Sequence, residues 1–191
     1  MNKKISQNKE IAYDVLLKII WRIYELEEND KVLSCTLENS LNVLDSEIFD
    51  ESSFKEVEER FNQLSPDSEG LWGKMSVGQM LWHCQVFVKD AIKNKKYTKR
   101  GNPIISWFFK KSMDSDKPWR KNLPTTPIAK AKEEKEFEVE HKKLQELVKE
   151  LYSLRDKKDW NAHPIFGDFT PEQWGKLEYK HLDHHLRQFG V

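Results

Sequence analysis

The sequence predicts an all-α protein, and three observations lead to that prediction. No run of the 191-residue chain alternates apolar and polar residues as a half-buried strand would. The chain has only seven glycines and seven prolines, so long stretches lack helix breakers. With 34% charged and 38% hydrophobic residues, it has the composition of amphipathic helices with solvated outer faces. A chain of this length can form one domain with a sizeable core.

Composition also argues against several kinds of partner. Lys plus Arg and Asp plus Glu number 32 each, so no net field attracts nucleic acid or an anionic membrane. No segment approaches the roughly 18 apolar residues of a membrane span. The two cysteines, Cys35 and Cys84, form no C-x-x-C pair. We therefore expect a cytoplasmic protein with a small-molecule substrate and with neither nucleic acid nor a membrane as partner.

The N-terminal region predicts a separate helix. Apolar residues recur at helical spacing over residues 8–28. We interpret residues 1–35 as an N-terminal helical extension and residues 36–191 as the main domain. The extension either packs on the main domain or mediates self-association, which makes a homodimer a candidate assembly.

Two helices are expected in the first half of the main domain. An apolar stripe at helical spacing predicts a helix near residues 52–64, within an acidic stretch. Ser76 and Gln79 form a capping box that begins a helix near residues 77–94. This second helix is apolar over much of its circumference, so we expect it to be central.

A long basic connection follows and leaves two interpretations open. Residues 89–121 are rich in lysine and interleaved with aromatic residues, and glycine and proline argue for irregular structure. This stretch either packs against the acidic segment or offers a surface to single-stranded nucleic acid or an anionic ligand.

Two further helices complete the prediction. Thr126 and Pro127 open a long helix, near residues 130–155, whose His141 we interpret as a satisfied core histidine. The last helix, near residues 171–189, has both ends marked: Thr170, Pro171 and Gln173 at the start and Gly190 as a left-handed cap at the end. The economical architecture is a four-helix bundle with a long crossover loop and an additional N-terminal helix.

Histidines on the inner faces of these helices are the candidate chemistry. His181 and His185 are four residues apart and lie only about 40° from each other around the helix. With His83 from another inward face they could bind Zn²⁺, Ni²⁺, Fe²⁺ or Cu²⁺, or they could be core histidines. His184 is expected on the less buried side, as a secondary candidate. Leu182 stands where H-E-x-x-H requires glutamate, which excludes that class of metalloprotease.

The blocks WGKMSVGQMLWHC and HPIFGDFTPEQWGKLEYKHLDHHLRQFG resemble the DinB-like (DinB/YfiT) metalloenzymes. The resemblance covers roughly residues 36–191 and is strongest to a bacterial subfamily known only as a domain of unknown function. It implies an up-down-down-up four-helix bundle with a divalent metal on His83, His181 and His185. It also implies thiol-dependent chemistry with a low-molecular-weight thiol.

Our functional hypothesis is a metal-dependent enzyme that holds Zn, Ni or Fe and acts as a thiol-dependent transferase or a hydrolase. Glu178 and Asp90 share helix faces with the histidines and are the candidate catalytic proton carriers. Gln79 and His163 are the candidate cofactor-binding or substrate-binding residues. One alternative is a non-catalytic metal-stabilised bundle or small-ligand-binding protein. A second is a nucleic-acid or membrane-surface module built on residues 93–121.

Overall fold

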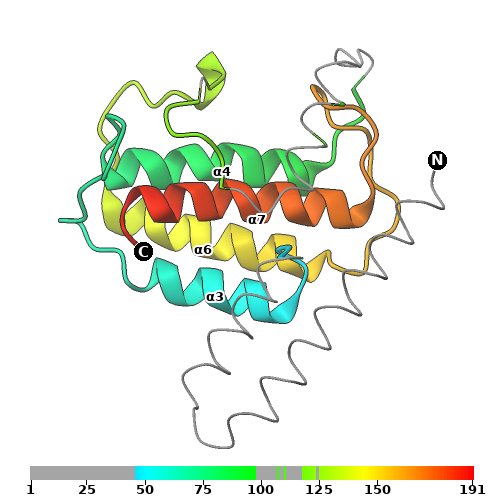
Figure 1. Cartoon of the computed structure of the whole chain (residues 1–191), viewed down its shortest axis with the longest axis horizontal. Coiled ribbons are helices and arrows are strands. Elements are labelled where there is room, and N and C mark those ends of the chain that lie inside the picture. The colour runs from blue at the N-terminus through cyan, green and yellow to red at the C-terminus, as the bar shows by residue number, and fades with distance from the viewer. Residues whose placement is uncertain (1–45, 98–106, 108–109, 111–117, 124) are drawn as a thin grey trace, which may run out of the picture. The chain divides into compact units, whose positions relative to one another are not determined.

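The computed structural model describes residues 46–97, 107, 110, 118–123 and 125–191 (Figure 1). The predicted N-terminal helix and the extension 1–35 lie outside these residues, as does most of the basic connection. The domain boundary at residue 35 therefore stays a prediction.

The described part of the chain is all-α, as predicted. Its elements are α3 (Glu51–Phe61), α4 (Val77–Lys93), the 3₁₀ turn η2 (Pro127–Ala129), α6 (Phe137–Ser153) and α7 (Pro171–Gln188). Within these residues the extended pairing is confined to an isolated bridge between His163 and Gly167. None of the described helices combines the length and apolar character needed to cross a membrane.

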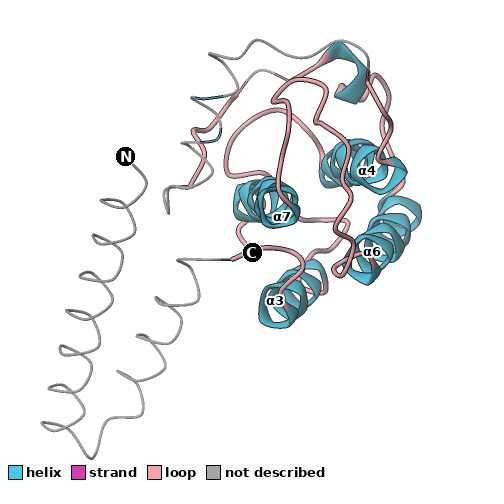
Figure 2. Cartoon of the chain, turned by 90° about the vertical axis from the view of Figure 1, so that its right-hand side faces the viewer, coloured by secondary structure: helices cyan, strands magenta, loops and turns pink. Residues whose placement is uncertain are grey.

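The four α-helices lie side by side (Figure 1). Seen along their length, α4 and α7 lie next to each other, with α6 and α3 on the other side (Figure 2). Helices α4 and α3 each pack against both α6 and α7. The largest fully buried apolar side chains come from all four helices and include Phe61, Met80, Leu81, Leu144, Leu151, Leu182 and Leu186.

The helix ends predicted for α4 and α7 are confirmed. The Ser76 hydroxyl accepts from the Gln79 amide across 3.3 Å, and Gln79 Oε1 accepts from the Ser76 amide across 3.2 Å. Thr170 and Gln173 form the same reciprocal pair at the start of α7. These caps satisfy amides that have no partner within the helix, which contributes about 1 kcal/mol at each start. Beyond α7, Gly190 has a φ of +79°, as its position predicted.

The predicted start of the third long helix was wrong. Thr126 and Pro127 open only the short turn η2, and α6 begins at Phe137. Residues 130–136 instead run past the beginning of α4. The close approach is made at Gly78, where an added Cβ would lie 2.1 Å from the Lys135 carbonyl oxygen. Tertiary packing overrides the helix propensity of this lysine- and glutamate-rich stretch.

Candidate metal centre

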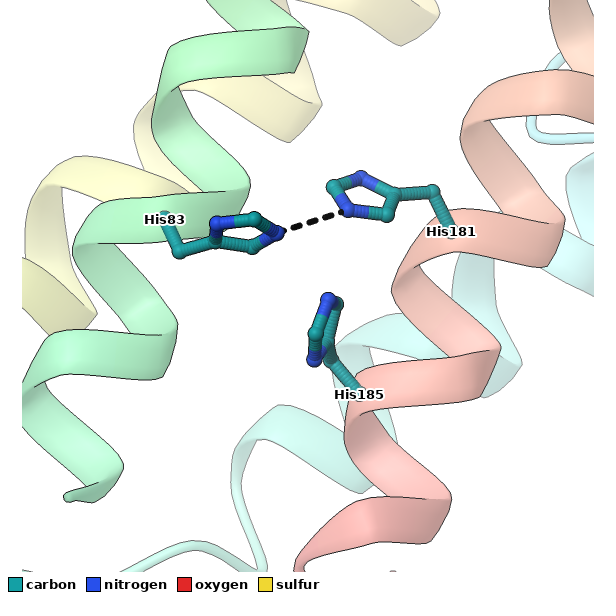
Figure 3. A group of neighbouring side chains, drawn as sticks. All are labelled: His83, His181 and His185. Carbon is teal, nitrogen blue, oxygen red and sulfur yellow. Dashed lines mark hydrogen bonds between the residues drawn. The ribbon is translucent and has the colours of Figure 1, made fainter. Parts of the chain in front are cut away.

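Three histidines from two neighbouring helices converge in the space between α4 and α7 (Figure 3). Helix α4 supplies His83, and α7 supplies His181 and His185 one turn apart. One ring nitrogen from each lies within 4.8 Å of the other two, and the Nε2 atoms of His83 and His181 are 3.2 Å apart. Their exposed fractions are 4%, 9% and 7% respectively, so all three rings are removed from water.

The ring of His83 is oriented by a backbone carbonyl. Its Nδ1 lies 2.8 Å from the oxygen of Ala129, the buried last residue of η2. Because a carbonyl only accepts hydrogen bonds, Nδ1 must carry the proton, and Nε2 then has a free lone pair. His83 therefore offers Nε2 toward the two histidines of α7.

The segment that supplies this carbonyl is held on the start of α4. The Ser76 hydroxyl donates to Glu134 Oε2 across 2.7 Å, and Gln79 Nε2 donates to the Glu133 carbonyl across 3.3 Å. Gln79, a predicted cofactor-binding residue, thus has both ends of its amide engaged, one in the helix cap and one on this segment. Its contacts hold the segment at residues 133–134, four residues beyond Ala129, and it is not part of the histidine group.

A side chain orients His185 in the same way. Its Nδ1 lies 2.9 Å from Oε1 of Gln188, which is itself buried. Gln188 in turn donates through Nε2 to the Trp72 carbonyl across 2.7 Å. This arrangement leaves Nε2 of His185 as the nitrogen with a free lone pair.

His181 is the histidine of the group whose second ring nitrogen has no hydrogen-bond partner. Its Nε2 faces His83 Nε2, while its buried Nδ1 has no hydrogen-bond partner. Whichever nitrogen carries the proton, one polar position of this ring is unsatisfied, at a cost of about 1–3 kcal/mol. The rings of Phe87 and Trp119 lie against it, with centroids 4.6 and 6.2 Å away.

Burial keeps these imidazoles neutral at pH 7. It lowers the pKa of His83, and it lowers the pKa of His181 well below the ordinary value near 6.5. Burial, together with the neighbouring His83, lowers the pKa of His185 to about 3. Neutral imidazole is the form that binds metals, so none of the three rings must first lose its positive charge to act as a ligand.

His184 is more buried than the sequence predicted. It was expected on the less buried side, yet its exposed fraction of 9% equals that of His181. Its ring packs between Trp72 and Trp119, with centroids 5.8 and 6.2 Å away. Aromatic side chains on that side of α7 cover a position that helical periodicity alone assigned to the periphery. His184 is not part of the converging group.

The candidate catalytic carboxylates lie on the same two helices but are not part of the converging group. Glu178 is 3% exposed, and its Oε2 is buried without a partner. Burial, reinforced by the charge of Asp90, raises the pKa of Glu178 to about 8. Asp90 is half-buried and accepts a 2.6 Å hydrogen bond from the Tyr97 hydroxyl. At neutral pH Glu178 is therefore largely protonated and able to donate a proton.

The structure does not bring His163 into the converging group. Its Nδ1 accepts from the amides of Ile165 and Phe166, across 3.2 and 3.1 Å, and the turn closes at Gly167 with a φ of +76°. Burial lowers the pKa of His163 to about 4, so the ring is neutral and its proton lies on Nε2. The HPIFG block is thus a turn organised around a histidine acceptor.

His141 was predicted to be a satisfied core histidine; it is hydrogen-bonded but half-buried. Its Nε2 donates to the Phe61 carbonyl across 2.9 Å, and its ring stacks on Phe137 with centroids 5.0 Å apart.

Sequence reasoning missed the two groups that orient the ligands, Ala129 and Gln188. The Ala129 carbonyl has no sequence signature, because every residue carries one. Gln188 did leave a signal, since it follows His185 by three residues and so lies on the same helical face.

The fold and the site of the described residues define a class of protein: an all-α domain with a buried group of three histidines. The chain belongs to the family described as "Protein of unknown function (DUF1569)", whose model matches residues 49–190. This match confirms the expected membership in a family of unknown function and includes all three histidines. The wider DinB-like membership stays a prediction. No curated protein matches the chain, and no solved structure matches it.

Proposed function

We propose that this protein is a metal-dependent enzyme of the DinB-like type, in which His83, His181 and His185 hold a divalent cation such as Zn²⁺, Ni²⁺ or Fe²⁺. One observation carries the proposal: three buried, neutral imidazoles converge from two helices. The up-down-down-up bundle topology and the cytoplasmic location belong to the same proposal.

One pair of ring nitrogens already has the spacing that such a cation requires, and the third nitrogen lies within 4.8 Å of both. Two nitrogens bound tetrahedrally to Zn²⁺ at about 2.05 Å are about 3.3 Å apart, and His83 Nε2 and His181 Nε2 lie 3.2 Å apart. Bound to a cation through Nε2, His181 would carry its proton on Nδ1, which lacks an acceptor in the structure. Glu178, one turn earlier on α7 with an unpartnered Oε2, could accept a hydrogen bond from this Nδ1–H through the unprotonated oxygen of its carboxyl group.

The donor set favours a catalytic site over a purely structural one. Among the described residues, no fourth His, Cys, Asp or Glu joins the group. Structural zinc sites are usually closed by four protein ligands, whereas catalytic sites keep three and leave a position for water or substrate. A cation held there would supply Lewis acidity, which activates a water or thiol and polarises a carbonyl.

The surrounding residues suggest roles around such a centre. Phe87 and Trp119 pack against His181 and exclude water from the rings. Glu178, protonated at neutral pH, is the proposed proton donor, and Asp90 its partner toward the surface. A low-molecular-weight thiol as co-substrate, and transferase or hydrolase chemistry, rest on the resemblance to the DinB-like enzymes. Cofactor-binding roles for Gln79 and His163 stay predictions, with much of their polar surface already engaged.

Reconstitution tests the proposal. Metal-free protein is loaded separately with Zn²⁺, Ni²⁺ and Fe²⁺, its metal content is measured, and each form is assayed for consumption of small thiols with electrophilic substrates. We expect close to one ion per chain and turnover that stops on chelation with little unfolding. Retained metal whose removal only lowers the melting temperature would favour the non-catalytic bundle. No retained metal in any form would contradict the proposal.

A further inference from the structure

Gln188, the last residue of α7, joins the histidine group to the turn that precedes α4. It is 3% exposed, with Oε1 2.9 Å from His185 Nδ1 and Nε2 2.7 Å from the Trp72 carbonyl oxygen. Both ends of its amide are therefore engaged, one by a ring of the histidine group and the other by backbone.

The two contacts together fix the direction of the amide. The Trp72 carbonyl can only accept, so the NH₂ end of Gln188 must face it. The remaining Oε1 can only accept, so His185 must carry its proton on Nδ1. A flipped amide would set two acceptors against each other across 2.7 Å at Trp72. The chain of contacts thus leaves Nε2 of His185 with a lone pair directed away from Gln188.

The turn itself is shaped around this glutamine. The Leu71 amide donates to the Gln188 carbonyl across 2.7 Å. Gly73 has a φ of +83°, and an added Cβ would lie 2.6 Å from Gln188 Nε2. A side chain at position 73 would be strained and would press on the amide, so the turn admits the glutamine because this residue is glycine.

We infer that Gln188 is a positioning residue that holds His185 in the tautomer offering Nε2 to a cation, and that it links the metal centre to the turn at residues 70–73. The inference rests on the proposed metal site. An acceptor on the second nitrogen fixes the orientation of a ligating imidazole and increases its donor strength. Gln188 thus accepts from Nδ1 of His185 and orients its ring, as the Ala129 carbonyl does for His83.

The test compares the parent with Gln188→Leu, which removes the acceptor, and Gln188→Glu, which retains one. Gln85→Leu is the matched control. Gln85 is also a buried glutamine, 1% exposed, but its amide contacts Glu140 and Lys89, on the side of α4 that faces α6.

The first readout is the tautomer of His185 in metal-free protein, from long-range ¹H–¹⁵N correlations of the imidazole. We expect a proton on Nδ1 in the parent, Gln85→Leu and Gln188→Glu, and a mixture of tautomers in Gln188→Leu. An unchanged Nδ1–H form in Gln188→Leu would overturn the inference.

The second readout is Zn²⁺ affinity, measured by chelator competition. We expect Gln188→Leu to bind about 10- to 100-fold more weakly, the range for outer partners of metal ligands. Gln188→Glu should restore part of the loss, because it keeps the acceptor for His185 but sets a carboxylate oxygen against the Trp72 carbonyl. Equal affinity in Gln188→Leu and Gln85→Leu would overturn the inference while leaving the proposed function standing. A parent that binds no metal would contradict the proposed function, and the tautomer comparison would then decide the role of Gln188.

Discussion

Helix α4 has two interior faces that differ in how completely their buried polar groups are hydrogen-bonded. Toward α6, Gln85 donates to the carbonyl and the carboxylate of Glu140 and accepts from Lys89. Toward α7, His83 meets His181, whose Nδ1 is buried without a partner. Buried polar groups cost stability unless they are hydrogen-bonded. The first face meets that condition within the protein, and the second leaves His181 Nδ1 without a hydrogen bond.

A related contrast separates the half-buried His141 from the buried His185. His141 satisfies its Nε2 on the Phe61 carbonyl and stacks on Phe137. His185 satisfies only Nδ1, through Gln188, and directs the other nitrogen into the histidine group. A histidine in a helical bundle is therefore a candidate metal ligand when one ring nitrogen is hydrogen-bonded to the protein and the other faces further histidines.

The largest expected effect on metal binding comes from replacing His185 by alanine, and the same replacement of His141 is its control. His185→Ala should weaken Zn²⁺ binding by more than about 100-fold, because loss of an outer partner alone costs about 10- to 100-fold. His141→Ala should bind Zn²⁺ as the parent does while losing about 1 kcal/mol of unfolding free energy, because the Phe61 carbonyl loses one of two hydrogen bonds and keeps the one from the Leu64 amide. Chelator competition and denaturant unfolding measure the two quantities. Equal metal binding by both variants would remove the distinction drawn here.

The acid side of the stability profile should reflect the face toward α7. Burial lowers the pKa of His83 and His181, and lowers that of His185 to about 3. Unfolded histidines titrate near 6.5, so below that pH the unfolded state binds more protons. The unfolding free energy of metal-free protein should therefore fall as pH drops from 6.5 toward 3, by up to about 1.4 kcal/mol per pH unit for each such histidine. A flat profile between pH 6.5 and 5, measured by denaturant unfolding, would contradict the buried neutral state.

The alkaline side should reflect Glu178, whose pKa is raised to about 8 by burial and by Asp90. Its protonated form is favoured in the folded state, so the associated stability is complete below pH 4.5 and is lost as pH rises through 8. Glu178→Gln should abolish this loss, which in the parent is spread between pH 4.5 and 8, so the variant should decline less between pH 6.5 and 8 and fall more steeply as pH drops from 6.5 to 4.5. An alkaline limb that persists in Glu178→Gln would place the responsible group elsewhere.

A smaller effect on Zn²⁺ binding is expected from replacing one of two helical glycines, Gly78, with Gly175 as the control. Gly78→Ala places a Cβ 2.1 Å from the Lys135 carbonyl oxygen, so the segment carrying Ala129 must shift away from His83. Gly175→Ala places one 2.9 Å from Phe49 Cδ2, away from the orienting contacts. Both should lose about 1–3 kcal/mol of unfolding free energy through overpacking. Only Gly78→Ala should also weaken Zn²⁺ binding, and equal affinities would show that the Ala129 carbonyl does not matter for the site.

The smallest effect comes from the helix cap farthest from these contacts. Thr170→Ala removes the acceptor for the Gln173 amide at the start of α7, which should cost about 1 kcal/mol of unfolding free energy. Zn²⁺ affinity should be unchanged. A weakened site in this variant would mean that the whole helix, rather than its local contacts, positions His181 and His185.

Sequence reasoning succeeded where the signal was local. Ser76 and Thr170 identified two helix starts because capping depends on residues three apart. The four-residue spacing of His181 and His185, with His83 on an inward face, identified three residues that do converge.

It failed where tertiary contacts decide. The helix predicted near residue 130 begins at Phe137, because Gly78 lets residues 130–136 pack on α4. His184 is buried by Trp72 and Trp119, which periodicity cannot anticipate.

Crystallography of the Zn²⁺-reconstituted protein, with data collected on both sides of the zinc absorption edge, tests the central claim most directly. We predict one anomalous peak between α4 and α7, bonded to Nε2 of His83, His181 and His185 at about 2.0–2.1 Å. A map without a peak there, with the three rings unchanged, would show that these histidines form a core rather than a metal centre.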